Sequence, residues 1–292
     1  MRLDKFLKPK TKKKVAVPFA HDDTVIKSVG YALRKGIADF ILFGDKRKIN
    51  RLAKKNNVDL SNIECIQELD AVTACNSAAR MARDGEVNVL MKGNVHTAIY
   101  VQSLLAKEHR LIPRGGVISQ ISVFDIPAYH KIIFLTDPGI NISPNLNQKV
   151  KILKNILAVT RSLGVKKPKV ACLAPVEMVT KRLRSTVEAE KISNMKGVFG
   201  NAIVEGPIGL DIAVSKEAAQ IKASRSKVSG DVDVLLFPEI HSGNMVYKTL
   251  MQFGNATAAG MIGGLKVPVV LTSRSDTEEV RELSMKLVMS LE

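Results

Sequence analysis

Apolar and polar positions along this chain alternate between two periodicities. Short Val-, Ile- and Leu-rich runs predict strands, and the segments between them place apolar residues at helical spacing, as Val25, Val29, Ala32 and Leu33 do after an acidic start. The predicted strands are 14–20, 38–44, 63–67, 87–93, 169–175, 201–207, 233–239 and 267–272. The predicted helices are 22–36, 45–57, 70–83, 96–108, 145–163, 186–196, 211–222, 244–254 and 276–291.

The middle of the chain has a different spacing. Segments 115–126 and 131–137 are both strand-like with no helical pattern between them, which predicts that they pair as neighbours. Segment 256–264 is rich in glycine and alanine. Strands that are each followed by a helix predict an α/β fold with mainly parallel sheets, covered on both faces. The length of 292 residues fits one large or two medium domains, and the turn-rich segment 136–144 is the predicted crossing point.

Ligands of such folds bind beyond the carboxyl ends of the strands, so the strand-end loops are where we expect the site. Six loops hold the chain's unusual chemistry: MKGNVHT, LTDPGINISP, APVE, EGPIGLD, PEIHSGN and LTSRSD. Together they are rich in glycine, hydroxyl, amide and cationic residues, which is typical of an anion-binding site. The candidate substrate-binding residues are Lys92, Gly93, Thr97, Thr136, Asp137, Asn141, Pro207, Asp211, Ser242, Gly243, Asn244 and Lys248.

The last of these loops ends a buried strand with hydroxyls around one arginine. Ser273, Arg274 and Asp276 precede the final predicted helix. An arginine holds two oxygens of a phosphate or carboxylate at once, and helix N-termini attract anions. The alternative is that the hydroxyls and Asp276 cap the helix while Arg274 points to solvent.

The charge of the chain also favours an anionic partner. The net charge is +16, of which residues 1–14 contribute +6. A positive field speeds the arrival of a polyanionic substrate. Nucleic acid is the alternative, but aromatic residues are only 4% of the chain, no Trp occurs and no nucleic-acid motif is found. A solvated basic surface explains many individual lysines equally well.

Other classes are disfavoured by missing signals. The chain has no G-x-x-x-x-G-K-[ST], no G-x-G-x-x-G and no G-x-S-x-G. Its five histidines lack metal-ligand spacing, so we expect no metal. Cys65, Cys75 and Cys172 are widely spaced and are expected to be buried reduced thiols. No apolar run reaches spanning length and no signal peptide is evident, which predicts a cytoplasmic protein with no membrane partner.

Several segments in order resemble the phosphate acetyl/butyryltransferase family, most like its butyryl branch. They are LMKGNVHT, TDPGINISPNLNQKVKILKNI, LGVKKPKVACLAPVE, VEGPIGLDIAVSKEAAQIK, GDVDVLLFPEIHSGNMVYKTL and AAGMIGGLKVPVVLTSRSD. The resemblance is strong over about residues 85–292. It implies transfer of an acyl group between coenzyme A (CoA) and inorganic phosphate, with both as substrates and no permanently bound cofactor. It also implies two α/β domains with an interdomain cleft, as in isocitrate/isopropylmalate dehydrogenases, in a homodimer or higher homo-oligomer.

The resemblance also implies residue roles. Ser273 and Arg274 match the family's catalytic Ser-Arg pair. The family also uses an acidic residue shortly after this pair as a base. Asp276, Glu278 and Glu279 all compete for that match, and we name Asp276 and Glu279 as catalytic candidates. Two pairs depart from the family pattern: Ser119-Gln120, where relatives often have Ser-His, and Pro138-Gly139. The Lys-rich start is also unlike the family, so deletion of residues 1–13 is expected to leave kinetics nearly intact.

The predicted domains are residues 1–140 with 256–292, and residues 141–255. The predicted activity is acyl-CoA + phosphate = acyl phosphate + CoA, with a short-chain acyl group such as butyryl. The alternatives are a metal- and NAD-dependent 2-hydroxy acid dehydrogenase of the same superfold, a basic nucleic-acid-binding protein, and a phosphate acyltransferase of lipid synthesis.

Overall fold

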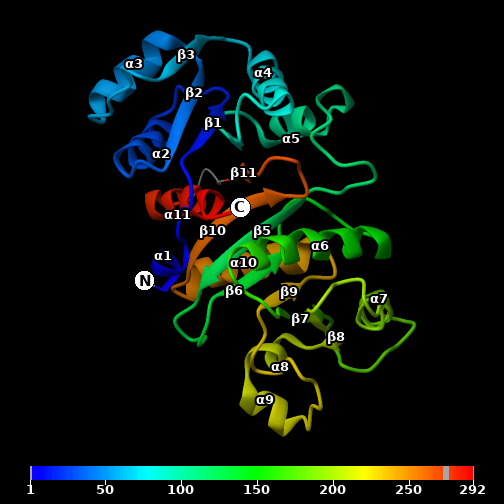
Figure 1. The fold of residues 1–292 in the computed structure, drawn as a ribbon. Coiled ribbons are helices and arrows are strands. Elements are labelled where there is room, and N and C mark those ends of the chain that lie inside the picture. The colour runs from blue at the N-terminus through cyan, green and yellow to red at the C-terminus, as the bar shows by residue number, and fades with distance from the viewer. Residues whose placement is uncertain (1, 272–275, 292) are drawn as a thin grey trace. The chain divides into compact units, whose positions relative to one another are not determined.

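The computed structural model of the chain describes residues 2–271 and 276–291. It confirms the alternation of strands and helices, which can be followed along the ribbon in Figure 1. By its internal contacts the chain divides into two compact units. The N-terminal unit comprises residues 6–116 and 259–292, and the central unit comprises residues 1–5 and 117–258.

The N-terminal unit is built on strands in the order β3-β2-β1-β4-β11-β10. Neighbouring strands are parallel except β10 and β11, which are antiparallel. The strands are β1 (Lys13–Val17), β2 (Ala38–Gly44), β3 (Glu64–Gln67), β4 (Val89–Met91), β10 (Thr257–Gly263) and β11 (Val269–Val270). β10 begins in the last residues of the central unit.

Helices flank these strands as the sequence pattern predicts. They are α2 (Asp23–Arg34), α3 (Lys46–Lys55), α4 (Ala71–Asp84), α5 (Thr97–Leu105), the short 3₁₀ helix η1 (Lys107–His109) and α11 (Glu278–Met289). α2 packs on α11 and α3, whereas α4 packs on α5, and Figure 1 shows α2 and α4 on opposite sides of the strands. Asp22, Asp45 and Asp70 cap α2, α3 and α4, which fixes where these helices begin.

The central unit is built on strands in the order β5-β6-β9-β7-β8. The first two strands pair as neighbours, as predicted, and they are antiparallel, whereas the other neighbouring strands are parallel. The strands are β5 (Ser119–Asp125), β6 (Ile133–Thr136), β7 (Lys169–Leu173), β8 (Ile203–Ile208) and β9 (Val234–Leu236). The helices are α1 (Arg2–Phe6), α6 (Leu146–Ser162), α7 (Arg184–Ser193), α8 (Leu210–Val214), α9 (Lys216–Ile221) and α10 (Ile240–Phe253).

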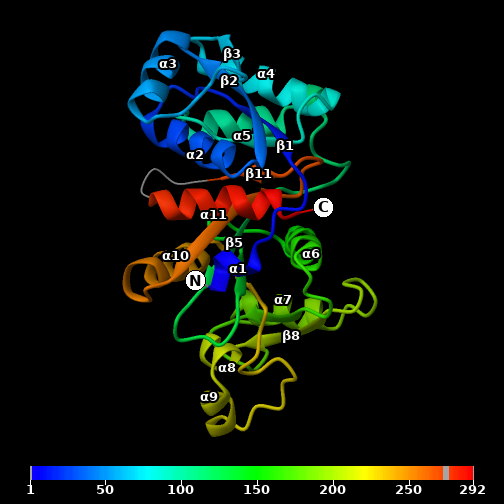
Figure 2. The ribbon, with the colours of Figure 1, turned by 60° about the vertical axis from the view of Figure 1, so that its left-hand side comes forward.

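The first residues of the chain are part of the fold, and Figure 2 shows α1 next to β5. Arg2 donates to the Asp125 carboxylate through its backbone N–H and its guanidinium. Leu3 and Leu7 are almost completely buried. Lys13 donates from Nζ to the Leu291 carbonyl at 2.7 Å. The Lys-rich segment therefore carries apolar anchors between its charges.

Two of the observed elements differ from the predicted ones. The glycine- and alanine-rich segment forms strand β10, since small residues also fit a buried strand next to another. The predicted helix 211–222 is two short helices, because Ser215 leaves the helical conformation and caps the second one. The units defined by internal contacts change over between residues 5 and 6, 116 and 117, and 258 and 259. The predicted domain bounds stay a prediction. Among the described helices, none is long and apolar enough to cross a membrane.

Candidate functional site

In the central unit, the loop after β6 is organised around one buried carboxylate. Asp137 accepts hydrogen bonds from the backbone N–H groups of Gly139, Ile140 and Asn141, and from Asn141 Nδ2 at 2.5 Å. The Asn141 amide also donates to the Ile118 carbonyl at 2.8 Å. Burial raises the pKa of Asp137, while these hydrogen bonds oppose the rise. Asp137 and Asn141 therefore hold the loop in shape.

The first turn of α10 rests on this same loop. Glu239 caps the helix by accepting from the N–H groups of His241 and Ser242. Gly243 is buried, and a Cβ there would lie 2.9 Å from the Asp137 carbonyl oxygen. Asn244 Nδ2 donates to the Pro138 carbonyl at 3.0 Å. The structure thus brings together two of the predicted loops, 136–141 and 242–244, whereas Lys248 lies exposed further along the helix.

The start of β5 lies against loop 136–141, a contact that the sequence analysis did not predict. Thr136 Oγ1 donates to the Gln120 carbonyl at 2.9 Å. The Gln120 side chain lies where a Cβ on residue 139 would be, so glycine at 139 makes room for it. The two departures from the family pattern, at 119–120 and 138–139, are therefore neighbours in space.

Pro207 and Asp211 belong to another part of the central unit. Pro207 lies within β8 and is half-buried. Asp211 is exposed at the start of α8, where it pairs with Lys222 at 3.0 Å. The hydrogen bond from Lys222 lowers the pKa of Asp211. Lys222 also pairs with Glu177 of the APVE loop, at 3.3 Å.

In the N-terminal unit, the loop after β4 packs tightly on the loop after β1. Gly93 is buried, and a Cβ there would collide with the Pro18 carbonyl oxygen, so only glycine fits. Asn94 N–H donates to the Phe19 carbonyl at 3.0 Å. Lys92 is 8% exposed, and its Nζ donates to the Gly93 carbonyl at 3.4 Å. Thr97 is exposed as the first residue of α5.

Ser273 and Arg274 lie outside the described residues. After them, Thr277 caps α11 by accepting from Val280 N–H, so the cap is Thr277 rather than Asp276. Asp276 is half-buried, and its carbonyl accepts from Arg281 Nε at 3.3 Å. Glu278 lies 3.6 Å from Lys27, and Glu279 is exposed. Arg281 is itself buried, a feature that the helical pattern alone did not single out.

The cysteines are poor nucleophiles in this fold. Cys75 and Cys172 are buried, as expected, and burial raises the pKa of Cys75 to about 11 and that of Cys172 to about 12. Burial also raises the pKa of the half-buried Cys65. At neutral pH, each thiol is therefore protonated.

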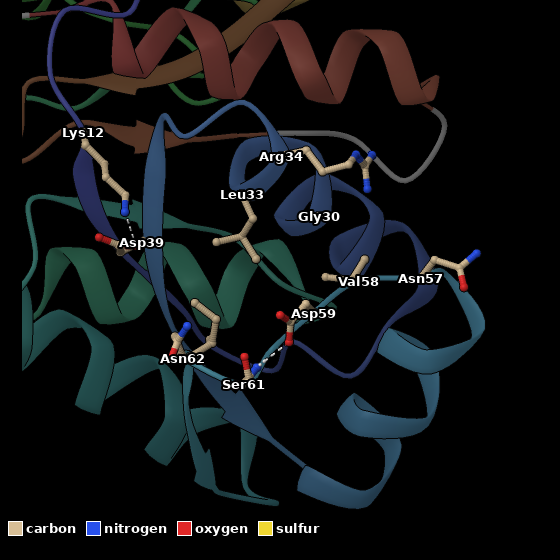
Figure 3. A pocket seen from close by; sticks show the side chains of 11 residues that line it. Lys12, Gly30, Leu33, Arg34, Asp39, Asn57, Val58, Asp59, Ser61 and Asn62 are labelled. Carbon is tan, nitrogen blue, oxygen red and sulfur yellow. Dashed lines mark hydrogen bonds and ion pairs between the residues drawn. The ribbon is translucent and has the colours of Figure 1, made fainter.

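One pocket of about 420 Å³ lies in the N-terminal unit, apart from the predicted site residues (Figure 3). Its lining comes from the segment before β1, from α2, from the start of β2 and from the loop before β3. It therefore lies at the amino ends of the strands. Lys12 pairs with Asp39 at its rim, and Asp59 accepts from Ser61 N–H, as Figure 3 shows. None of the predicted site residues lines it.

Comparisons with known proteins agree on one family. The model of the family described as "Phosphate acetyl/butaryl transferase" matches residues 2–76 and 70–283. The chain is 38% identical to the phosphate butyryltransferase of Clostridium beijerinckii over 283 residues, which cover 96% of this chain and 93% of the relative. It is 36% identical to the phosphate acetyltransferase of Thermotoga maritima over 280 residues, 94% of each protein.

A solved structure is similar in fold and sequence. The crystal structure of a branched-chain phosphotransacylase from Enterococcus faecalis superposes with a TM-score of 0.84 at 30% identity. The match covers 95% of this chain and 98% of that protein.

Proposed function

This chain belongs to the phosphate acetyl/butyryl transferase family, and from that premise we propose how its residues carry out the reaction. The reaction moves a short-chain acyl group, butyryl or similar, between CoA and inorganic phosphate. CoA and phosphate are substrates, and no cofactor is indicated. The observation that carries this assignment is the match to butyryl- and acetyltransferases over nearly the full length of the chain.

The chemistry sets three requirements. A phosphate oxygen must be held against the thioester carbonyl carbon. The oxygen that becomes negative as the bond forms needs donors, each contributing about 2.7–4 kcal/mol. The leaving thiolate of CoA takes up a proton, and in the reverse direction a base removes that proton from the thiol.

We assign the requirements to the loop before α11. Arg274 binds phosphate through its fork, Ser273 donates to the oxyanion, and an acid near the start of α11 exchanges the thiol proton. Asp276, Glu278 and Glu279 all stay candidates for that acid, and Glu278 lies 3.6 Å from Lys27. The raised pKa values of Cys75 and Cys172 support direct attack by phosphate over an acyl-cysteine intermediate.

We propose two kinds of role for the other predicted residues of the substrate site. Lys92, Thr97, Ser242 and Lys248 are proposed to contact substrate. Gly93, Gly243 and Asn244 are proposed to shape the site, since each packs on or bonds to a neighbouring loop backbone.

Three of the remaining residues use their polar groups in hydrogen bonds that shape loop 136–141, and the other two lie in β8 and α8. Asp137 accepts from Asn141 within the loop, whereas Thr136 donates to the Gln120 carbonyl of β5. Pro207 and Asp211 stay candidates for contacts with CoA.

Cellular and quaternary predictions belong to the same proposal. We propose a cytoplasmic homodimer with the isocitrate/isopropylmalate dehydrogenase-like architecture, on the basis of the sequence resemblance. Sedimentation equilibrium of the purified protein tests the dimer: a mass of a single 31.9 kDa chain at micromolar concentration would contradict it. The dehydrogenase and nucleic-acid-binding alternatives find no support among the relatives.

The test of the function is release of free thiol from acetyl-, propionyl-, butyryl- and branched-chain acyl-CoA, with and without phosphate. We expect release only with phosphate, with an equal amount of acyl phosphate trapped as hydroxamate. Chain-length preferences should overlap, because one methylene in an apolar pocket changes binding by only about 1–3 kcal/mol. Thiol release that ignores phosphate would refute the assignment.

A further inference from the structure

Helix α3 is the most cationic element of the fold. Six of its ten residues are Lys or Arg, and all six are exposed; this α3 cationic face consists of Lys46, Arg47, Lys48, Arg51, Lys54 and Lys55. Ile49 and Ala53 face inward and are buried. Lys48 lies 3.9 Å from Asp45 and Lys55 lies 2.9 Å from Asp23. Within the described part of the chain, the other four cations have no carboxylate within ion-pair distance.

This arrangement costs helix stability. Lys46, Arg47 and Lys48 occupy the first turn, where the helix dipole disfavours positive charge. Arg47 and Lys55 both stand four residues from Arg51, and like charges at that spacing repel. A pattern that opposes local stability points to a role in binding rather than in folding.

α3 starts beside one of the predicted site loops. The loop 92–97 packs on the loop after β1, where Asn94 N–H donates to the Phe19 carbonyl. The Phe19 ring lies 4.3 Å from the His21 ring, centroid to centroid. Asp45 N–H, at the cap of α3, donates to His21 Nδ1 at 3.2 Å. A short chain of contacts therefore joins the predicted site loop to the first turn of α3.

One of the two substrates has charges that match this face. CoA carries a phosphomonoester and a diphosphate at its adenosine end, whereas its pantetheine arm and the acyl group are neutral. We propose that the α3 cationic face binds the phosphorylated adenosine end of CoA. This proposal rests on the proposed function, in which CoA is a substrate. Free inorganic phosphate is also a phosphate anion but has fewer phosphate groups than CoA, so the test must separate binding of the two.

The test compares wild-type protein with the triple variant Lys46→Gln/Arg47→Gln/Lys48→Gln. Calorimetry at low ionic strength measures CoA binding, and we expect affinity to fall by about tenfold, a difference that shrinks as salt is added. The Michaelis constant for inorganic phosphate should stay unchanged. The melting temperature should not fall, because the substitutions relieve repulsion.

A second substrate isolates the adenosine end. The variant should lower kcat/KM for butyryl-CoA by about tenfold and leave kcat/KM for butyryl-pantetheine unchanged, since the latter lacks the charged end. The control variant Lys166→Gln/Lys167→Gln removes two exposed cations of the central unit, before β7, and should behave as wild type.

Three results would overturn the proposal: unchanged CoA affinity in the triple variant, an equal fall for both thioesters, or a loss confined to inorganic phosphate. Failure of the reaction itself is a separate result. A wild-type protein that binds CoA without releasing thiol would refute the proposed function, and the calorimetric comparison would still decide the role of α3.

Discussion

Asp231 lies before β9, forms ion pairs with Lys169 at 2.6 Å and Lys131 at 2.9 Å, and is hydrogen-bonded to His130 Nε2 at 3.0 Å. Burial alone would raise the pKa of Asp231, but the hydrogen bonds from these three partners outweigh it and hold the pKa well below its usual value. This carboxylate ties together the amino ends of three segments of the central unit.

The Asp231 network predicts a pH dependence of stability. Its folded pKa lies below the unfolded value of about 3.9, so its contribution is present above that pH and is lost as pH falls through the folded pKa. Asp231→Asn should unfold at lower urea than wild type at pH 7, and the difference should shrink below about pH 4. Urea unfolding between pH 7 and pH 2 measures this. A difference that stays constant across the range would contradict it.

Arg274 carries the proposed phosphate contact, and its charge and its shape can be separated. Arg274→Lys keeps the positive charge and loses the planar fork that holds two oxygens. We expect turnover to fall by about 10²-fold or more, comparable to the loss of one transition-state donor. Steady-state kinetics in both directions measure this, with an unchanged melting temperature as the control for folding. Near-normal turnover would remove Arg274 from the reaction.

At the scale of elements, loop 136–141 and α10 form one packed assembly in the central unit. The loop is held by Asp137, and the helix approaches it closely because Gly243 has no side chain. Glycine inside an exposed helix ordinarily costs about 1 kcal/mol relative to alanine. Here it permits the contact with the Asp137 carbonyl, which places Ser242 and Asn244 beside the loop.

Gly243→Ala tests this packing. Helix propensity favours the substitution, but the added Cβ would lie 2.9 Å from the Asp137 carbonyl oxygen and 3.1 Å from Pro138 Cα. We expect a net loss of stability of about 1–3 kcal/mol, as in other overpacked sites, together with reduced turnover. Met245→Ala, on an exposed position of the same helix, is the control and should change neither. A more stable Gly243→Ala protein would show that the helix does not need this approach.

The elements were predictable because they follow from local patterns. Asp22, Asp45 and Asp70 mark helix starts in the sequence as they do in the structure. What the sequence did not supply were contacts between distant segments. The neighbourhood of Gln120 and Gly139 depends on the antiparallel pairing of β5 with β6, and the burial of Arg281 depends on how α11 packs. The many cations of α3 can be read from the sequence, but their place beside the loops after β1 and β4 follows only from the fold.

At the scale of the whole molecule, the chain's beginning is built into both compact units. Leu3 is buried in the central unit, and Leu7 is buried in the N-terminal unit. The net charge of +16 therefore includes lysines on a segment with structural anchors, not only on a solvated tail.

Deletion of residues 1–13 tests whether the buried leucines of this segment stabilise the fold. The sequence predicts nearly unchanged kinetics, and the structure adds that stability should fall, because burying one leucine side chain contributes about 1.5–3 kcal/mol. A lower melting temperature with normal turnover well below it is the expected result. Replacing Lys8, Lys10 and Lys12 by Gln in the full chain is the matched control and should leave the melting temperature almost unchanged. Equal stability of the deleted protein would contradict the anchoring role.

The central claim is that phosphate itself attacks the thioester, with no acyl group ever carried by the protein. The buried, protonated thiols of Cys75 and Cys172 are consistent with that route. The most direct test is exchange of isotopically labelled CoA into butyryl-CoA by the purified enzyme with phosphate absent. The account predicts no exchange until phosphate is added, and then exchange at a rate comparable to turnover. Rapid exchange without phosphate would reveal an acyl-enzyme and contradict the account.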